Sequence, residues 1–399
     1  MLGLGLGTTQ AQGLVDALAQ VTNTKSIAFD GSNDYISISN LNITGACSFS
    51  LWIKPDTIHS YDVFFGSANN FIRIQADNGG KIAWDSVSDS NVFDLSTPLV
   101  QDQWNHLALT RDGSGNGIVY LNGSSVSTGS GISGTLDYDR IGQKNDEGYF
   151  GGNMDEIAVW TSQLSADEIT QIYNSGTATL DLSTDSGNYS SSANLQAWWR
   201  MGDGTLDEHP LVADQTNLTL ATSIVQNGDF EDTIAITSSG YPNHNYVDET
   251  SNSGQDLTIS TDTSNPRNGS QCMKLTLTGA TSGEANYKIE DIPAGLYKIS
   301  IFARNGVSQN SAKIRLGGHT LLRSFSSADS GSIDLTDSYQ EIVAYLNLAS
   351  TTTIFFTIGV TNGTDGHHIL VDDFSVQKFN GNAGLMTNMA SGDIVTDTP

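Results

Sequence analysis

Short apolar runs that alternate with polar residues constrain this chain more than any other feature of its sequence. Ser26–Phe29, Tyr35–Ile38 and Phe49–Ile53 each place apolar side chains at every second position. Turn signals such as Asp30-Gly31 and Asn122-Gly123 separate runs of this kind. Because such alternation buries one face of a strand and leaves the other to solvent, the pattern predicts antiparallel β-sheets.

The same pattern recurs in the second half of the chain, from Cys272–Leu277 to Ile369–Gln377. A chain of 399 residues exceeds one ordinary sandwich, and all six tryptophans precede residue 200. We therefore predict an all-β protein with two tandem antiparallel β-sandwich (jelly-roll) domains. One short helix is expected in the first domain, where Ser165 and Glu168 have the spacing of a capping box.

The predicted boundaries follow the changes in pattern along the chain. They are an N-terminal docking peptide with a short helix (1–24), a first jelly roll (25–222), a second jelly roll (224–379) and a polar tail (380–399). The first ten residues carry no Lys or Arg, and no stretch of the chain reaches about 18 apolar residues, so neither a signal peptide nor a membrane span is expected. The docking residues proposed on this basis are Leu2, Leu4, Leu6, Leu14 and Leu18, the last two sharing a helix face with Val21.

The charge balance excludes two classes of partner. The chain holds 44 acidic and 17 basic residues, which gives a formal net charge of −27. A field of this sign repels nucleic acids and anionic membranes, so neither is expected as a partner. It is compatible with cation binding, but a solvated acidic surface is the preferred interpretation.

Four segments of the first half resemble the laminin-G-like, concanavalin-type jelly rolls. They are Ser26–Ile36 (SIAFDGSNDYI), Phe49–Lys54 (FSLWIK), Trp104–Arg111 with Ile118–Gly123, and the closing run Phe150–Trp160 (FGGNMDEIAVW). The segment Leu195–Gly204, with Trp198 and Trp199, resembles a strand that usually opens such domains. Its late position resembles virus-derived jelly rolls and extends the first domain to residue 222.

The second half resembles the galactose-binding-like jelly rolls of many carbohydrate-binding modules. Asn227–Glu231 (NGDFE) resembles the opening of that family and Ile369–Val376 (ILVDDFSV) its end. Between them, Gly295–Arg304 is similar to its central strand pair.

Two structural Ca²⁺ sites are considered, because carboxylate and carbonyl oxygens are the ligands that Ca²⁺ prefers. The second resemblance implies one site at Glu231 and Asp373, with Asp372 beside them. In the first domain, Asp30 and Asp34 are expected to meet Asp155. An ordinary polar strand end and a simple turn at Asp30-Gly31 are the alternatives.

Sugar binding requires exposed aromatic faces beside polar side chains. Trp52, Trp104 and Trp160 lie in alternating strands and are expected in the core. The glycan-binding candidates, which lie near loops, are Trp84, Tyr61, Tyr149, Tyr241 and Tyr246.

Catalytic motifs find little support in the sequence. Jelly-roll glycosidases carry closely spaced carboxylates on one strand, such as Glu-x-Asp-x-x-Glu, and no such run is present. Asp155 and Glu156 are adjacent, so their side chains are expected on opposite faces of a strand. The chain is therefore not expected to be an enzyme.

These features lead to one functional interpretation. The chain is interpreted as a non-catalytic virion structural protein of a phage, as a fibre, spike or capsid decoration that adheres to host or environmental glycans. Its expected partners are other virion proteins at the N-terminus, a cell-surface glycan and, in a fibre, two further copies in a homotrimer. The alternatives are a cellular glycan-binding adhesin, extracellular or at the cell surface, and, more remotely, a polysaccharide-active enzyme.

Overall fold

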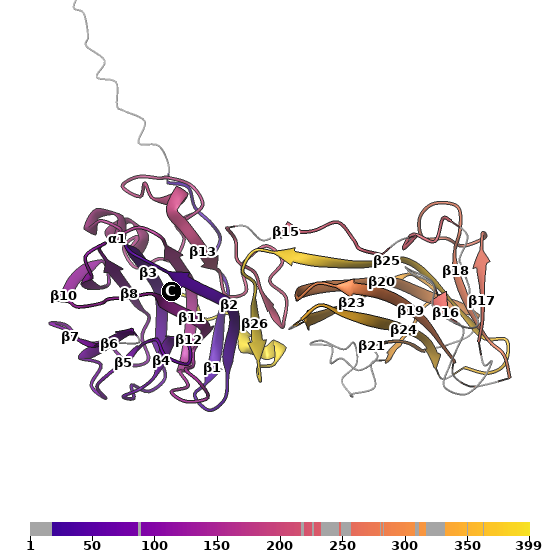
Figure 1. Cartoon of the computed structure of the whole chain (residues 1–399), viewed down its shortest axis with the longest axis horizontal. Coiled ribbons are helices and arrows are strands. Elements are labelled where there is room, and N and C mark those ends of the chain that lie inside the picture. Colours follow the sequence, from indigo (N-terminus) through magenta and orange to yellow (C-terminus); the bar gives the residue numbers. More distant parts are fainter. Residues whose placement is uncertain are drawn as a thin grey trace, which may run out of the picture. The chain divides into compact units, whose positions relative to one another are not determined.

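The computed structural model describes residues 18–86, 89–216, 219–225, 227–232, 247–248, 257–279, 281, 283–307, 311–316, 332–348, 350–361 and 363–399. These residues form two compact units (Figure 1). The first unit runs to Thr216 and also includes Gly384–Pro399, and the second lies between residues 217 and 383. Antiparallel sheets dominate both units, which confirms the predicted all-β class.

The first sheet of the first unit joins strands from both ends of the described chain. Its order is β10 (Ser124–Ser130), β9 (Asn116–Leu121), β8 (Asn105–Arg111), β3 (Cys47–Pro55), β12 (Gly151–Trp160), β1 (Ser26–Asp30) and β27 (Ile394–Val395). β13 (Leu195–Trp199) also pairs with β12, so the segment with two tryptophans belongs to this unit as expected.

The second sheet of the first unit packs on the first sheet. Its order is β14 (Leu211–Val212), β26 (Gly384–Thr387), β2 (Tyr35–Ile43), β11 (Leu136–Ile141), β4 (Val63–Gly66), β5 (Phe71–Ile74), β6 (Lys81–Ser86) and β7 (Asp89–Asp94). Between the sheets, Phe49 makes edge contacts with Trp84 and Tyr138, with ring centroids 5.8 and 5.6 Å apart. The inward-facing side chains of the two sheets thus form one shared core that is rich in aromatic residues.

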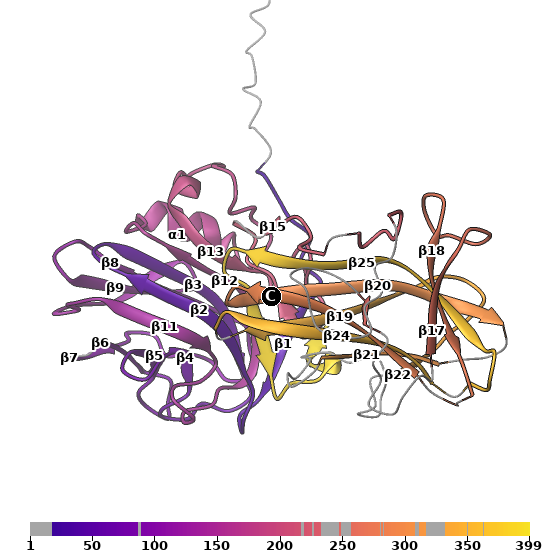
Figure 2. The ribbon, with the colours of Figure 1, turned by 45° about the vertical axis from the view of Figure 1, so that its right-hand side comes forward.

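Helix α1 (Ala166–Tyr173) covers the outer face of the first sheet (Figure 2). It begins at the predicted capping box, in which the Ser165 hydroxyl accepts from the Glu168 backbone N–H, and it ends at Asn174 in the left-handed conformation. Its buried Ile169 and Ile172 pack with Trp160. The short 3₁₀ turns η1 (Ser192–Asn194) and η2 (Ser391–Asp393) complete the helical structure described in this unit.

The second unit is also a pair of antiparallel sheets around its own core. One has the order β17 (Leu257–Asp262), β18 (Cys272–Leu277), β25 (His368–Asn380), β20 (Gly295–Val307) and β23 (Gln340–Leu348), with β15 (Thr219–Leu220) beside β25. The other has the order β16 (Val247–Asp248), β19 (Gly283–Ile292), β24 (Thr352–Thr361), β21 (Ser311–Leu316) and β22 (Ser332–Asp334). Phe374 contacts Tyr287 and Phe356 edge-on in this core.

Three expectations about the chain's organisation are corrected. Residues 384–399 are not a tail, because β26 pairs with β2 and β27 pairs with β1. Thr219 and Leu220, expected at the end of the first domain, pair with β25 of the second unit. The part of the predicted N-terminal helix that is described, from Leu18 onward, is extended, and Gln20 forms a β-bridge with Leu180.

The extended segment also changes the interpretation of Leu18. With Val21, this side chain is half-buried against the cluster beneath α1, which removes it from the expected docking surface. Leu2, Leu4, Leu6 and Leu14 lie outside the described residues. Among the residues that are described, no helix has the length and apolar character that crossing a membrane requires.

Candidate functional site

The outward face of the second sheet carries an unusual group of aromatic and cationic side chains. In β5, Ile72 and Ile74 point into the core, so Phe71 and Arg73 point outward. Phe71 packs with Val63 of β4 in a small cluster separate from the core. The alternation that builds the core therefore also presents Arg73 on this face.

Arg73 lies against two aromatic rings. Its guanidinium carbon is 4.2 Å from the centroid of Tyr61 and 4.1 Å from that of Phe71, within the range of cation–π attraction. Its Nε donates to Oε1 of Gln75 at 3.1 Å. Burial lowers the pKa of Arg73, but a guanidinium remains charged in proteins.

Tyr61 is the most exposed of the large hydrophobic residues described, with 53% of its surface open to solvent. Its backbone φ is +87°, a left-handed conformation that is rare and costly for a bulky residue. Hydrogen bonds from the Tyr61 N–H to the Ile74 carbonyl (2.8 Å) and from the Val63 N–H to the Gly148 carbonyl (2.9 Å) hold the loop in place. Strain of this kind suggests a functional role for the exposed ring.

The loop after β11 borders the same face. Arg140 donates to Gln143 Oε1 at 2.7 Å and pairs with Asp146 at 3.3 Å. Gln143 in turn donates to the Tyr149 hydroxyl at 3.2 Å. Lys144 lies 4.8 Å from the centroid of Phe71. We call Tyr61, Phe71, Arg73, Arg140, Lys144 and Tyr149 together the Arg73 patch.

The structure sorts the aromatic candidates by their place in the strands. Tyr61 and Tyr149 lie on adjacent loops of the Arg73 patch. Trp84 was wrongly placed among the exposed rings, because its register in β6 points it into the core, where it is 0% exposed and donates to the Tyr138 hydroxyl at 3.1 Å. Tyr241 and Tyr246 lie outside the described residues. Sequence reasoning missed Arg73, although the alternation in Phe71–Ile74 already places it beside Phe71.

Of the three tryptophans expected in the core, Trp52 and Trp160 are buried as expected. Trp104 is only half-buried, and its Nε1 donates to Asp397 at 3.2 Å.

The proposed calcium ligands of the second unit bind protein donors instead. Glu231 accepts hydrogen bonds from the backbone and hydroxyl of Ser270, which lower the pKa of its carboxyl. Asp373 pairs with the guanidinium of Arg267, and the buried Asp372 accepts from the Arg267 backbone at 2.8 Å. A cation beside Asp373 does not fit a cage of oxygen ligands. Calcium binding in this unit stays a prediction.

The three residues proposed for the first calcium site do not converge. Asp30 accepts from the backbone of Ser32 and Asn33, as the simple turn requires, and Asp34 accepts from the Asp30 N–H at 2.9 Å. In the pairing of β1 with β12, Asp30 lies opposite Gly151. Asp155 is four residues further along, which at the rise of a strand is about 13 Å away. No group of three His, Cys, Asp or Glu side chains that could hold a metal occurs among the described residues.

A β-bulge corrects the expectation for Asp155 and Glu156. The register of β12 on β3 shifts between Asp155 and Ala158, and Glu156 has a φ of +42°. Met154 and Ile157 both point into the core, so the two carboxylates between them share the opposite face. Burial, together with the neighbouring Glu156, raises the pKa of Asp155, and burial raises that of Glu156 to about 7.

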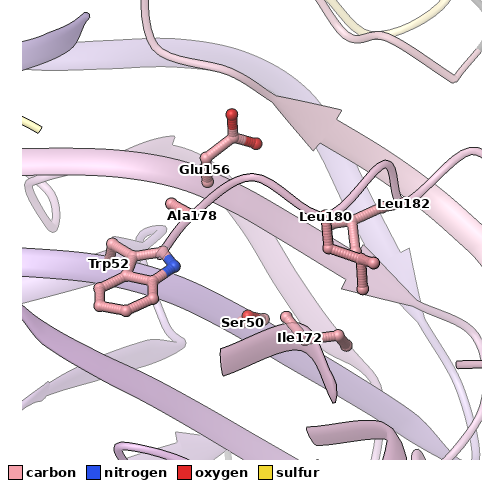
Figure 3. A pocket seen from close by; sticks show the side chains of 7 residues that line it. All are labelled: Ser50, Trp52, Glu156, Ile172, Ala178, Leu180 and Leu182. Carbon is pink, nitrogen blue, oxygen red and sulfur yellow. The ribbon is translucent and has the colours of Figure 1, made fainter. Parts of the chain in front are cut away.

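These carboxylates lie beneath the α1 layer rather than on an open surface. Glu156 accepts from Trp198 Nε1 at 2.5 Å and pairs with Arg200 at 2.9 Å, and Asp155 accepts from Asn23 at 2.9 Å. The adjoining cavity has a volume of about 10 Å³, enough for roughly one water molecule (Figure 3). It is too small for a sugar. The residues that line it are Ser50, Trp52, Glu156, Ile172, Ala178, Leu180 and Leu182.

His106, which lies on the same face, should make the stability of the fold depend on pH. The ring is fully buried, its Nε2 lies 2.8 Å from the Ser50 hydroxyl, and burial lowers its pKa from 6.5 to about 3. Below pH 6.5 His106 becomes protonated in the unfolded chain but stays neutral in the folded chain. Its contribution to the free energy of unfolding is therefore fully present above pH 6.5 and is lost as the pH falls towards 3. Between pH 7.5 and pH 5 the loss should be about 2 kcal/mol.

Urea unfolding at these two pH values measures this loss. His106→Gln should show a correspondingly smaller decrease in the free energy of unfolding between them. An unchanged decrease would contradict a neutral, buried His106.

Residues 30–170 match the family model of the Concanavalin A-like lectin/glucanases superfamily. This match confirms the resemblance inferred from the motifs of the first half, and it covers a little over a third of the chain. No curated protein matches the chain.

Several solved structures match parts of this chain at low similarity. A putative carbohydrate binding protein from Bacteroides ovatus is 22% identical, with a TM-score of 0.39, and the match covers 49% of this chain and 56% of that one. Domain 4 of the arabinanase AbnA from Geobacillus stearothermophilus, in complex with arabinotriose, is 22% identical (TM-score 0.34; 39% and 81% covered). A pentraxin from Limulus polyphemus is 17% identical (TM-score 0.33; 38% and 82% covered).

The concanavalin A-like region contains the whole Arg73 patch and also the bulge at Asp155 and Glu156. The region therefore contains two candidate sites, the Arg73 patch and the pair of carboxylates at the bulge. Tyr61 exposes its ring beside polar groups of the patch, whereas both carboxylates of the bulge are buried.

Proposed function

We propose that the chain is a non-catalytic glycan-binding protein and that the Arg73 patch is its binding face. The observation that carries this proposal is the exposed ring of Tyr61, held in a strained backbone conformation beside a fixed arginine. An aromatic face supplies apolar area for a sugar ring, and the neighbouring amide and charged groups can bind its hydroxyls. The match of residues 30–170 to a superfamily named for lectins supports the same proposal.

The superfamily's name also includes glucanases, but the described carboxylates favour binding over hydrolysis. Glycoside hydrolysis needs a protonated acid and a second carboxylate on either side of the scissile bond. Asp155 and Glu156 have raised pKa values, yet the cavity beside them holds about one water. On the Arg73 patch, Asp139 and Asp146 pair with Arg140 at 3.6 and 3.3 Å.

Substitution of Tyr61 tests the binding proposal. Tyr61→Gly removes the ring while keeping a residue that adopts a positive φ readily, so the fold should be retained. We expect binding on a glycan array to be lost, or weakened at least about tenfold, since an aromatic contact of this kind contributes on the order of 1 kcal/mol beyond the area it buries. Val92→Ala is the matched control, because Val92 lies on β7 of the same sheet and is 42% exposed.

The same glycan array can also contradict the proposal. If the wild-type protein binds no glycan, or if Tyr61→Gly and Val92→Ala bind equally well, the Arg73 patch is not a glycan site.

We further propose that this binding serves a phage virion, as a fibre, spike or capsid decoration. Two features support this assignment: the uncharged Gly/Leu-rich start of the chain, and β13, which follows β12 in sequence and pairs with it. Other virion proteins would bind the N-terminal segment, and a fibre would be a homotrimer. Mass spectrometry of purified particles tests the assignment, and a protein found only in cells or on their surface would favour a cellular adhesin.

A further inference from the structure

We infer that the glycan bound by the Arg73 patch is acidic, and that Arg73 binds the carboxylate of a uronic acid residue. The inference rests on the proposed function and names its ligand class.

Arg73 differs from the neighbouring cations because it lacks an acidic partner among the described residues. Acidic residues outnumber basic ones by 44 to 17, so a carboxylate is rarely far from a cation in this chain. On the same sheet, Lys81 pairs with Asp94 and Arg140 with Asp146. Among the described residues, no carboxylate oxygen lies within the 4.0 Å of an ion pair with Arg73.

The Arg73 side chain is already positioned to bind an anion. Its Nε donates to Gln75, while Tyr61 and Phe71 fix the plane of the guanidinium. Its two terminal Nη groups have no hydrogen-bond partner among the residues described. Such a pair of donors matches the two oxygens of a carboxylate in a bidentate contact. Little side-chain entropy is then lost on binding, because the arginine is already ordered.

The surrounding charges limit the charge that the patch can accept. Lys144 lies over the same Phe71 ring as Arg73, but it already pairs with Glu147 at 3.4 Å. Asp85 and Glu147 act on Arg73 only at longer range, and the chain as a whole carries −27 charges. Polyanions are therefore repelled by the overall field. A single carboxylate in an otherwise neutral oligosaccharide fits the local charge best.

Calorimetric titration of the full chain tests this inference. The probes are a neutral oligosaccharide that bears one glucuronate, and the same compound with its carboxyl methyl-esterified. The wild-type protein should bind the acid at least about tenfold more tightly than the ester, as expected for a charge-assisted hydrogen-bond pair. Added salt should reduce this preference.

Variants assign the preference to one side chain. Arg73→Gln should bind acid and ester with equal affinity, because its side chain carries no charge that distinguishes them. Lys81→Gln, which removes a neighbouring cation that already has a partner, should keep the preference. The melting temperature and near-ultraviolet circular dichroism of Arg73→Gln establish that it remains folded.

The possible results separate this inference from the function on which it rests. Equal binding of acid and ester by the wild type, or a preference that persists in Arg73→Gln, overturns the inference and leaves glycan binding intact. Tighter binding of a polysulfated glycan than of the glucuronate also overturns it. If the chain binds no glycan at all, the proposed function itself fails.

Discussion

Deleting residues 384–399 is expected to lower the free energy of unfolding of the first unit by about 5 kcal/mol, at 1.5–3 kcal/mol for each large apolar side chain removed from a core. The segment contributes the buried side chains of Leu385, Met386 and Met389. The deletion also removes β26 from the edge of β2 and β27 from the edge of β1. Backbone groups of β1 and β2 are then left unpaired.

Fluorescence can assign this loss to one unit. All six tryptophans precede residue 200, so tryptophan emission reports the unfolding of the first unit alone. The tryptophan transition should move to lower urea concentration, whereas the second transition, followed by circular dichroism, should remain unchanged. Deletion of Thr398 and Pro399 alone is the control, since it keeps Asp397 and its 2.6 Å ion pair with Lys54. An unshifted tryptophan transition would show that β26 and β27 are dispensable.

Arg200→Met should have a comparable effect through a different cause. Arg200 and Glu156 form an ion pair in which the side chains are only 10% and 6% exposed. Removing one partner of a buried pair leaves an uncompensated charge, which typically costs about 3–5 kcal/mol. The cost should be measured at pH 8.5, because burial raises the pKa of Glu156 to about 7 and protonation would reduce the cost at lower pH.

Two further variants separate this effect from lost packing. Glu156→Gln combined with Arg200→Met removes the orphaned charge and should recover much of the stability, as a double-mutant cycle would show. Lys81→Met breaks an exposed pair, with side chains 45% and 76% exposed, and should cost less than about 1 kcal/mol. If the double variant is no more stable than Arg200→Met alone, the charge is not the cause.

The sequence predicts the strands of this chain well because alternation and burial have the same physical origin. Phe49–Ile53 and Ile82–Trp84 are strands for the reason their pattern indicates, namely that one face of each lies in the core. Alternation gives two faces but does not say which of them is buried. Trp84 was therefore expected near solvent although its register points inward.

Alternation in the sequence does not predict local irregularities or short edge strands. The bulge at Asp155 and Glu156 places neighbouring side chains on the same face, and nothing in the alternating residues around it signals the extra position. Residues 384–387 (GLMT) lie in a stretch of mostly small and polar residues, yet they form a strand because the edge of β2 offers a partner. Pairing with a distant edge is a tertiary effect that local pattern does not contain.

The Arg73 patch could be predicted only in part for a similar reason. Tyr61 and Tyr149 were identified from their loop positions, but their proximity depends on the contact between the Val63 and Gly148 backbones. Arg73 and Lys144 are ordinary surface cations in the sequence. Only the pairing of β4 with β5 and β11 brings them to one face.

Because β26 and β27 belong to the first unit, that unit is interrupted in the chain by the whole of the second. A ribosome that has completed residue 216 must still add the 167 residues 217–383 before Gly384, the first residue of β26, is made. At about 5–20 residues per second, this delay lasts roughly 8–33 s. The second unit is therefore synthesised before the closing strands of the first. A chain that stops before residue 384 would expose unpaired edges of β1 and β2, which can pair with other chains.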